Sequence, residues 1–193
     1  MALTESTMLT LGTKSPDFRL VDVVTNREVT LSDFKDGNAF LVMFICRHCP
    51  YVKHIEEELA KIGRDYKGKS LGIVAISSND PDYAWEDRLE GLKEQAESVG
   101  FSFPYLFDED QSVAKAYTAA CTPDFFLFDK DKKLVYRGQL DDSRPENGLP
   151  VTGKDLRNAI DNVLIGKSID ASQKPSAGCN IKWKQGNSPS YFA

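Results

Sequence analysis

Two cysteines in the segment Cys46-Arg47-His48-Cys49-Pro50 are the residues whose types and spacing could do chemistry. A pair of cysteines separated by two residues, between a predicted strand and a predicted helix, is typical of a thiol–disulfide redox centre. The start of a helix stabilises a thiolate through unpaired backbone N–H groups and the helix dipole. The sequence therefore predicts that Cys46 and Cys49 are catalytic. Cys46 is expected to be the attacking, more exposed thiol, and Cys49 the resolving thiol.

The residues between the cysteines are expected to support this chemistry. A protonated His48 would lower the pKa of Cys46 and make the pair more oxidising, and Arg47 would add to the effect. A zinc site formed by Cys46, His48, Cys49 and His54 is disfavoured, because four side chains at one helix start cannot converge tetrahedrally. We therefore expect no metal and no cofactor.

The elements around the cysteines follow from hydrophobic patterning. The apolar run 39–45 predicts a strand buried on both faces, and apolar residues recur every three or four positions over 51–62, as in an amphipathic helix. Pro50 suits the first turn of that helix. Elsewhere the patterns predict a hairpin within 12–34, strands at 71–76, 103–107, 125–128 and 133–137, and helices at 85–99, 111–120 and 153–165. Leu89, Leu92 and Ala96 are expected to face inward. Strands alternating with helices predict an α/β three-layer sandwich.

Length and composition set further expectations. The 193 residues carry a net charge of -5, which disfavours nucleic-acid binding. The longest apolar run precedes Cys46 and is too short to span a membrane, and the N-terminal residues lack the pattern of a signal peptide. We therefore expect a cytoplasmic protein without a membrane partner. Residues 1–11 are expected to form a flexible N-terminal arm, 12–166 one domain, and 167–193 a C-terminal tail packed on it.

The order of a strand, the cysteine pair, a helix and then Thr122-Pro123 before another strand resembles the thioredoxin fold. In that family a cis-proline faces the disulfide, which implies that Pro123 and Thr122 line a substrate groove. The N-terminal hairpin resembles the alkyl hydroperoxide reductase/thiol-specific antioxidant (AhpC/TSA) branch, through PDF at 16–18 and LSDF at 31–34.

Four blocks resemble, more closely, a bacterial CxxCP group of uncharacterised thioredoxin-like, peroxiredoxin-related proteins: CRHCPYV at 46–52, DFFLFD at 124–129, DDSRP at 141–145 and GCNIKW at 178–183. The resemblance implies a thioredoxin-like domain over 12–166. It also implies an antioxidant thiol–disulfide oxidoreductase that acts on protein or small-molecule disulfides and is served by a dithiol reductant.

Two departures keep alternatives open. The strand 39–45 has no acid, whereas thioredoxin has a buried aspartate there. The threonine and proline of the peroxiredoxin motif are also missing, although Cys49-Pro50 echoes its Cys-Pro. A peroxidase with Cys49 as the peroxidatic residue is one alternative, with Arg137 or Arg144 supplying a guanidinium unless they are surface charges. A non-enzymatic redox sensor or adaptor is another.

Cys121 and Cys179 are possible extra redox thiols. They could form a second disulfide with each other, or they could be packed spectators, which cytosolic thiols often are. The acidic segments 80–82 and 108–110 are expected to be solvated turns.

Overall fold

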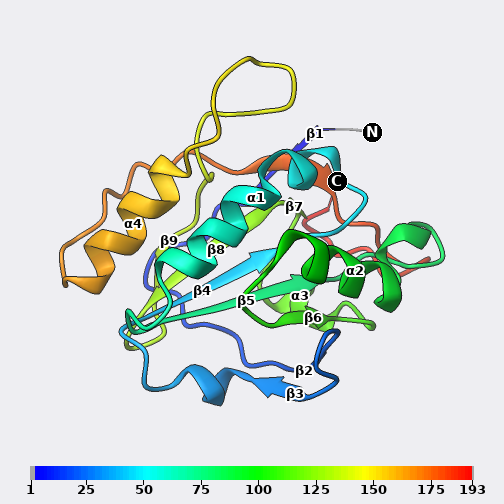
Figure 1. Ribbon diagram of the computed structural model, residues 1–193, viewed down its shortest axis with the longest axis horizontal. Coiled ribbons are helices and arrows are strands. Elements are labelled where there is room, and N and C mark those ends of the chain that lie inside the picture. Colours follow the sequence, from blue (N-terminus) through cyan, green and yellow to red (C-terminus); the bar gives the residue numbers. More distant parts are fainter. Residues whose placement is uncertain (1–2, 193) are drawn as a thin grey trace.

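The computed structural model describes residues 3–192, and its main sheet has seven strands in the order β3-β2-β6-β5-β4-β8-β9 (Figure 1). The strands are β2 (Arg19–Asp22), β3 (Glu28–Thr30), β4 (Ala39–Phe44), β5 (Leu71–Ser77), β6 (Tyr105–Phe107), β8 (Asp124–Asp129) and β9 (Leu134–Tyr136). β4, β5 and β6 run parallel, and every other neighbouring pair is antiparallel. The expected N-terminal hairpin is β2–β3, and β8–β9 is the expected second hairpin.

The central strand β4 explains the apolar run before the cysteines. All six of its residues are buried. Phe40, Val42 and Phe44 belong to the hydrophobic core on one face of the sheet, and Leu41 and Met43 to the core on the other. A strand covered on both faces has no solvent side, and its sequence therefore shows no polar alternation.

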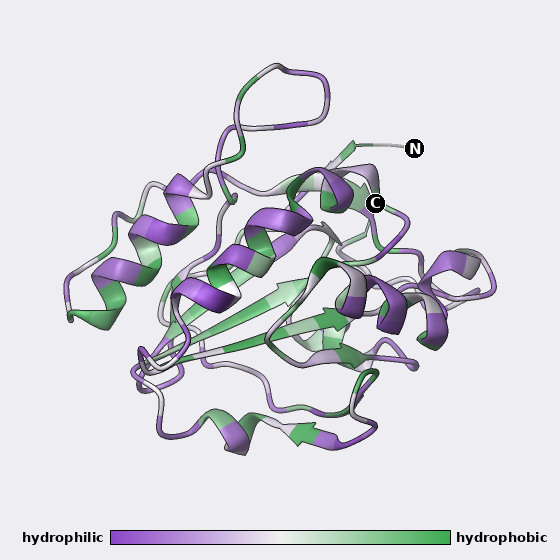
Figure 2. Ribbon diagram, viewed as in Figure 1, coloured by the Kyte–Doolittle hydropathy of each residue, from purple (hydrophilic) through white to green (hydrophobic). Residues whose placement is uncertain are grey.

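Helices cover both faces of this sheet and complete the predicted three-layer sandwich. The helices α1 (Pro50–Asp65), α2 (Leu89–Val99) and α4 (Lys154–Leu164) pack on one face, and α3 (Ser112–Ala116) packs on the other. Each long helix turns its apolar stripe toward the sheet and its polar side outward (Figure 2). None of the helices within residues 3–192 has the length and apolar character needed to cross a membrane.

The segment 85–99 departs from the single predicted helix. A 3₁₀ turn, η2 (Trp85–Asp87), precedes α2, and a second 3₁₀ turn, η1 (Leu31–Phe34), follows β3. Leu92 and Ala96 face the core as expected, but Leu89 is 50% exposed. The expectation for Leu89 was wrong because Leu89 is the first residue of α2 and lies at the N-terminal end of the helix.

A second, three-stranded sheet joins the two ends of the chain. Its order is β1 (Leu3–Glu5), β10 (Ala177–Asn180) and β7 (Cys121–Thr122), all antiparallel. The tail strand β10 lies in the middle and pairs with β1 on one side and β7 on the other. Residues 3–5 are therefore held in a sheet rather than in a flexible arm; residues 1 and 2 lie outside the described part.

Two expectations of surface charge were also wrong. Arg137 is fully buried, where its guanidinium forms an ion pair with Asp124 at 3.2 Å and donates to Thr118 and Thr7. Asp108 is fully buried too, because its carboxylate accepts the backbone N–H groups at the start of α3. Both charges are satisfied inside the fold, as buried charges must be.

Candidate active site

The two cysteines lie where the sequence places them, between β4 and α1. Ile45 extends β4 by a hydrogen bond to the carbonyl of Ile76, Cys49 is the N-cap of α1, and Pro50 occupies the first turn. Both thiols are fully buried, with no exposed area. The expectation that Cys46 is the more exposed thiol was therefore wrong for this conformation.

Thr122 holds both sulfur atoms. Its hydroxyl lies 3.2 Å from Cys46 Sγ, and its carbonyl oxygen accepts a hydrogen bond from Cys49 Sγ, also at 3.2 Å. The peptide bond from Thr122 to Pro123 is cis. The two thiols also hydrogen-bond to each other. A single residue thus positions both members of the pair within reach of a disulfide bond.

The pKa values of the two thiols move in opposite directions. Burial raises the pKa of Cys46, and the bond to Cys49 and the negative charge of Asp87 add to the rise, while the Thr122 hydroxyl opposes it. Hydrogen bonds from the thiols of Cys179 and Cys46 lower the pKa of Cys49. The expectation of a lowered pKa for Cys46 is not met, because burial and a carboxylate outweigh the nearby basic side chains.

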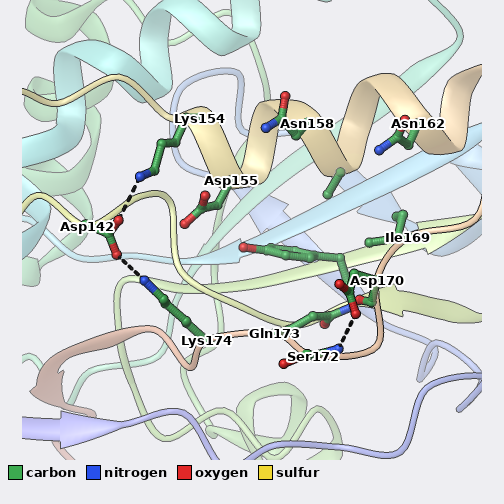
Figure 3. Close-up of a pocket in the computed structure, with 12 residues that line it drawn as sticks. Asp142, Lys154, Asp155, Asn158, Asn162, Ile169, Asp170, Ser172, Gln173 and Lys174 are labelled. Carbon is green, nitrogen blue, oxygen red and sulfur yellow. Dashed lines mark hydrogen bonds and ion pairs between the residues drawn. The ribbon is translucent and has the colours of Figure 1, made fainter.

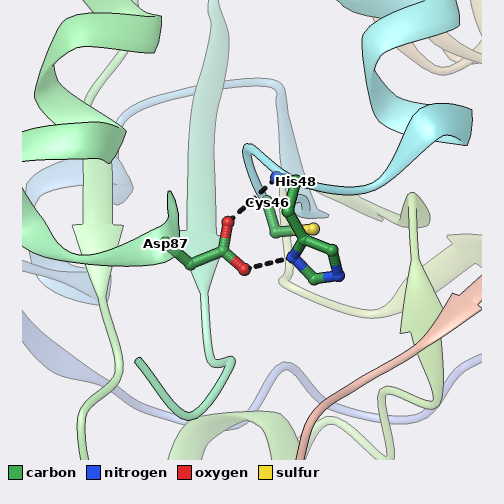
Figure 4. A group of neighbouring side chains, drawn as sticks. All are labelled: Cys46, His48 and Asp87. Atoms are coloured by element: carbon green, nitrogen blue, oxygen red, sulfur yellow. Dashed lines mark hydrogen bonds and ion pairs between the residues drawn. The ribbon is translucent and has the colours of Figure 1, made fainter. Parts of the chain in front are cut away.

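Asp87, from η2, is the functional residue that the sequence did not reveal. Its fully buried carboxylate accepts the backbone N–H groups of Arg47 at 2.8 Å and His48 at 3.1 Å. It also accepts His48 Nδ1 at 2.6 Å, which requires a proton on that nitrogen, and Asn79 Nδ2 at 2.7 Å. Figure 4 shows Asp87 and His48 beside Cys46. Asp87 therefore brings a buried acid to the cysteines, from a segment distant from β4.

The surroundings of Arg47 and His48 explain why they do not lower the pKa of Cys46. The Arg47 guanidinium forms an ion pair with Glu94 at 2.7 Å, and His48 pairs with Asp87. Each of the two side chains therefore has a carboxylate partner of its own. His54 lies apart from the thiols, where its Nε2 meets the hydroxyl of Ser143 at 2.7 Å.

Cys46, His48 and Asp87 offer donor atoms within 4.8 Å of one another, a spacing that a metal ion could use. Asp87, however, already receives four N–H donors from Arg47, His48 and Asn79. These hydrogen bonds form a network that fixes the loop between the cysteines.

The predicted substrate groove is covered in this structure. Thr122 is 2% exposed, and its strand β7 pairs with β10, so that Cys179 stands opposite Thr122 and Asn180 opposite Cys121. The groove that Thr122 and Pro123 were expected to line for a substrate thus holds the protein's own tail strand. The sequence could not reveal this pairing, because it joins residues more than fifty positions apart.

Cys121 and Cys179 project to opposite faces of the small sheet. Directly opposed residues share a face and successive residues alternate, so Cys179 lies on the face of Thr122, and Cys121 lies on the other. Cys179 belongs to the core cluster that contains Cys46 and Cys49. Burial raises the pKa of Cys121, and the neighbouring Asp124 raises it further. A disulfide between Cys121 and Cys179 does not fit this geometry.

A separate pocket of about 290 Å³ lies beside α4 (Figure 3). Its charged side chains largely satisfy each other, as Asp142 bonds Lys154 at 2.7 Å and Lys174 at 2.8 Å. No cysteine or histidine lines it. The candidate chemistry is therefore at the thiols.

The chain is similar to known proteins both in sequence and in structure. The model of the AhpC/TSA family matches residues 11–137. The thiol-disulfide oxidoreductase ResA of Geobacillus kaustophilus (strain HTA426) is 31% identical over 133 residues, which cover 68% of this chain and 70% of ResA.

Two solved structures extend the comparison. A hypothetical protein from Sinorhizobium meliloti 1021 is 53% identical with a TM-score of 0.93, over 95% of this chain and all (100%) of that one. The thioredoxin domain of a thiol-disulfide oxidoreductase from Bacteroides vulgatus shares the fold, with a TM-score of 0.64 at 22% identity over 81% of this chain and 99% of that one. The protein belongs to the AhpC/TSA family and has the thioredoxin-like fold.

Proposed function

We propose that this protein is a thiol–disulfide oxidoreductase in which Cys46 and Cys49 cycle between dithiol and disulfide. The main support for the proposal is that both sulfur atoms lie beside Thr122, each 3.2 Å from one of its oxygen atoms. The oxidoreductase ResA, which is similar over two thirds of the chain, supports the same activity.

The hydrogen bonds of Thr122 match one protonation state of the pair. When the proton is on Cys49, that thiol donates to the Thr122 carbonyl and a Cys46 thiolate accepts the Thr122 hydroxyl. When the proton is on Cys46, the Cys49 thiolate accepts bonds from the thiols of Cys179 and Cys46. Because the two thiols are hydrogen-bonded, one proton can move between them and transfer the negative charge.

This exchange of the proton gives each cysteine a role. The Cys46 thiolate attacks one sulfur of a substrate disulfide, forms a mixed disulfide and releases the first substrate thiolate. Cys49 gives its proton to the released substrate thiolate, and the Cys49 thiolate then attacks Cys46 Sγ, forms the Cys46–Cys49 disulfide and releases the second substrate thiolate. Two electrons pass from the dithiol to the substrate. A dithiol reductant restores the pair by the same exchange in reverse.

Exposed aromatic side chains favour a protein disulfide as the substrate. Tyr83 is 73% exposed and Trp85 is 70% exposed, and both lie in the segment that ends at Asp87. Large exposed apolar side chains beside a reactive site are typical of a protein-binding surface. We place this exchange in an antioxidant role in the cytoplasm, where reduced thiols are the normal state.

Turnover measured with single-cysteine variants tests the proposal. Reduction of a protein disulfide by dithiothreitol should fall by roughly three orders of magnitude or more in Cys46→Ser, because a covalent nucleophile is lost. Cys49→Ser should accumulate a mixed disulfide on Cys46. Cys121→Ser is the matched control and should keep normal turnover. Normal turnover in Cys46→Ser would overturn the proposal.

A peroxidase with Cys49 as the reactive thiol is the second candidate. It is favoured by the lowered pKa of Cys49, which hydrogen bonds from Cys179 and Cys46 cause. Against it, the Arg137 guanidinium is committed to Asp124, and Arg144 donates to Gln139 and to backbone carbonyls. Trapping a sulfenic acid on Cys49 after treatment with hydrogen peroxide, at a rate that exceeds disulfide exchange, would favour this activity.

A further inference from the structure

The tail strand β10 occupies the backbone edge beside the two thiols and brings a third thiol to them. Cys179 is the residue of β10 that stands directly opposite Thr122. Because opposed residues share a face of a sheet, Cys179 and Thr122 project toward the same side, where Cys46 and Cys49 lie. Cys179 is 1% exposed and packs in one cluster with both cysteines.

The close fit of β10 shows that this placement is built into the chain. Gly178 lies so near the cis-proline segment that a Cβ atom there would be 2.0 Å from the Thr122 carbonyl oxygen and 3.1 Å from Pro123 Cδ. The hydroxyl of Ser176 donates to the Pro123 carbonyl at 2.7 Å. Glycine is thus required beside Cys179 for the strand to approach the site.

Further bonds fix the other end of the tail strand. The backbone N–H of Ile181 donates to Ala120 at 3.1 Å, and that of Lys182 donates to Asn79 Oδ1 at 2.8 Å. Asn79 also donates to Asp87, so one side chain links the tail to the acid beside Cys46. Cys179 is therefore held on both sides against the thiol pair.

The partner of Cys179 is Cys49. The two thiols hydrogen-bond to each other, and this bond is the largest cause of the lowered pKa of Cys49. The pKa of Cys179 is raised by the same bond and then by burial. Cys121 lies on the opposite face of the sheet, next to Asp124.

We propose that Cys179 is a third redox-active thiol, which takes over the disulfide from Cys46–Cys49 to form Cys49–Cys179. This inference rests on the proposed function. The family match ends at residue 137, so the third thiol belongs to a part of the chain beyond it.

The exchange balances within the protein. The Cys179 thiolate attacks Cys49 Sγ of the Cys46–Cys49 disulfide, one S–S bond forms and one breaks, and the electron pair of the broken bond goes to Cys46 Sγ. The proton lost by Cys179 ends on Cys46. The number of oxidised thiols is unchanged, and no outside oxidant is needed. Cys46 is then a thiol again, and the oxidising equivalent is held by Cys49 and Cys179.

Disulfide mapping tests the third thiol without any substrate. The full-length protein is oxidised with one equivalent of diamide, its free thiols are blocked in acid under denaturing conditions, and its disulfide-linked peptides are identified by mass spectrometry. Wild type should yield both Cys46–Cys49 and Cys49–Cys179 peptides. Cys46→Ser should yield Cys49–Cys179 as its main product, while Cys46→Ser combined with Cys179→Ser should yield no disulfide within the chain.

The outcomes separate this inference from the proposed function. Absence of Cys49–Cys179 from both wild type and a folded Cys46→Ser variant overturns the third thiol, as does pairing of Cys179 with Cys121. If Cys46→Ser does not fold by circular dichroism, the wild-type map decides. If the wild-type protein forms Cys49–Cys179 but does not turn over a disulfide substrate, the proposed function is overturned and the third thiol stands.

Discussion

At the scale of single residues, Asp87 and Thr122 shift the pKa of Cys46 in opposite directions. Thr122 was expected beside the thiols from its position before Pro123, and it forms a hydrogen bond with each sulfur atom. Asp87 could not be identified from the sequence, because no motif around it distinguishes it from the other acidic residues of the chain, which has 29 in all. Its role depends on a loop that folds back over the cysteines, and that is a tertiary effect.

Replacing Asp87 should separate its charge from its hydrogen bonds. Asp87→Asn keeps an oxygen for the N–H groups of Arg47 and His48 but removes the negative charge that helps to raise the pKa of Cys46. The pKa of Cys46 should fall, and alkylation of Cys46 near neutral pH should become several times faster. Rates measured across pH on a Cys49→Ser background, with and without the Asp87 change, would show this.

Removing the carboxylate altogether should instead affect stability. Asp87→Ala leaves buried N–H groups without acceptors, which should cost about 2–4 kcal/mol. Urea unfolding measures the loss. Equal stability of Asp87→Ala and Asp87→Asn would contradict a positioning role for the hydrogen bonds.

The hydroxyl of Thr122 should act in the opposite sense to Asp87. It lowers the pKa of Cys46, so Thr122→Val, which keeps the branched shape, should raise that pKa and slow alkylation of Cys46. Thr122→Ser retains the hydroxyl and is the matched control. An unchanged pH profile in Thr122→Val would show that the hydroxyl does not interact with the thiolate.

At the scale of elements, local patterns predicted the strands and helices well. The apolar run 39–45 forms β4 and Ile45 just beyond it, and the stripe Val52, Ile55, Leu59 and Ile62 forms the buried face of α1. Both were predictable because the spacing of apolar residues in each segment follows which of its residues are buried. The short strands β1, β7 and β10 carry no such signal. Each has two to four residues, and they form a sheet only through partners far along the chain.

Gly178 tests whether the tail strand must approach so closely. Gly178→Ala places a methyl group 2.0 Å from the Thr122 carbonyl oxygen, so β10 should shift and stability should fall by about 1–3 kcal/mol. Gly148→Ala is the control. Gly148 has a positive φ of 71° but open space around it, so it bears only the backbone cost of about 1 kcal/mol.

The readout for Gly178→Ala is thermal unfolding together with the accessibility of the thiols. Cys49 should react faster with a bulky maleimide in Gly178→Ala than in Gly148→Ala. The same low reactivity in both variants would mean that β10 does not cover the site in solution.

At the scale of the whole molecule, the buried ion pair of Arg137 and Asp124 joins the two ends of the second hairpin, and hydrogen bonds to Ser6 and Thr7 connect this pair to the segment just after β1. Both side chains are fully buried, and Ser6, just after β1, also donates to Asp124. The sequence favoured a surface role for Arg137, since arginine is rarely buried without a partner and the partner could not be identified in advance.

Breaking this pair should destabilise the fold strongly. Arg137→Ala leaves the Asp124 carboxylate uncompensated and should cost about 3–5 kcal/mol. Arg19→Ala removes the exposed pair with Glu28 and should cost at most about 1 kcal/mol. Urea unfolding of both variants checks the difference, and similar losses would argue against a structural role for the buried pair.

The exposed aromatic residues bear on substrate choice. Trp85→Ala should raise the KM for a protein disulfide by roughly fivefold, since an exposed aromatic anchor contributes about 1 kcal/mol to binding. Turnover of a small aromatic disulfide should be unchanged, because such a substrate does not reach that surface. Leu149→Ala, which alters a half-exposed side chain in the loop before α4, is the control. Equal effects on both substrates would contradict a docking role for Trp85.

The position of β10 in the chain also has a consequence for biosynthesis. A chain emerges from the ribosome with its N-terminal end first, so β4 to β9 are made before β10. Until β10 arrives, β1 lacks its pairing strand, and the backbone of Thr122 has no strand beside it. A partly synthesised chain therefore carries an uncovered dithiol, open to oxidation and to wrong partners, at the stage when the rest of the fold can already form.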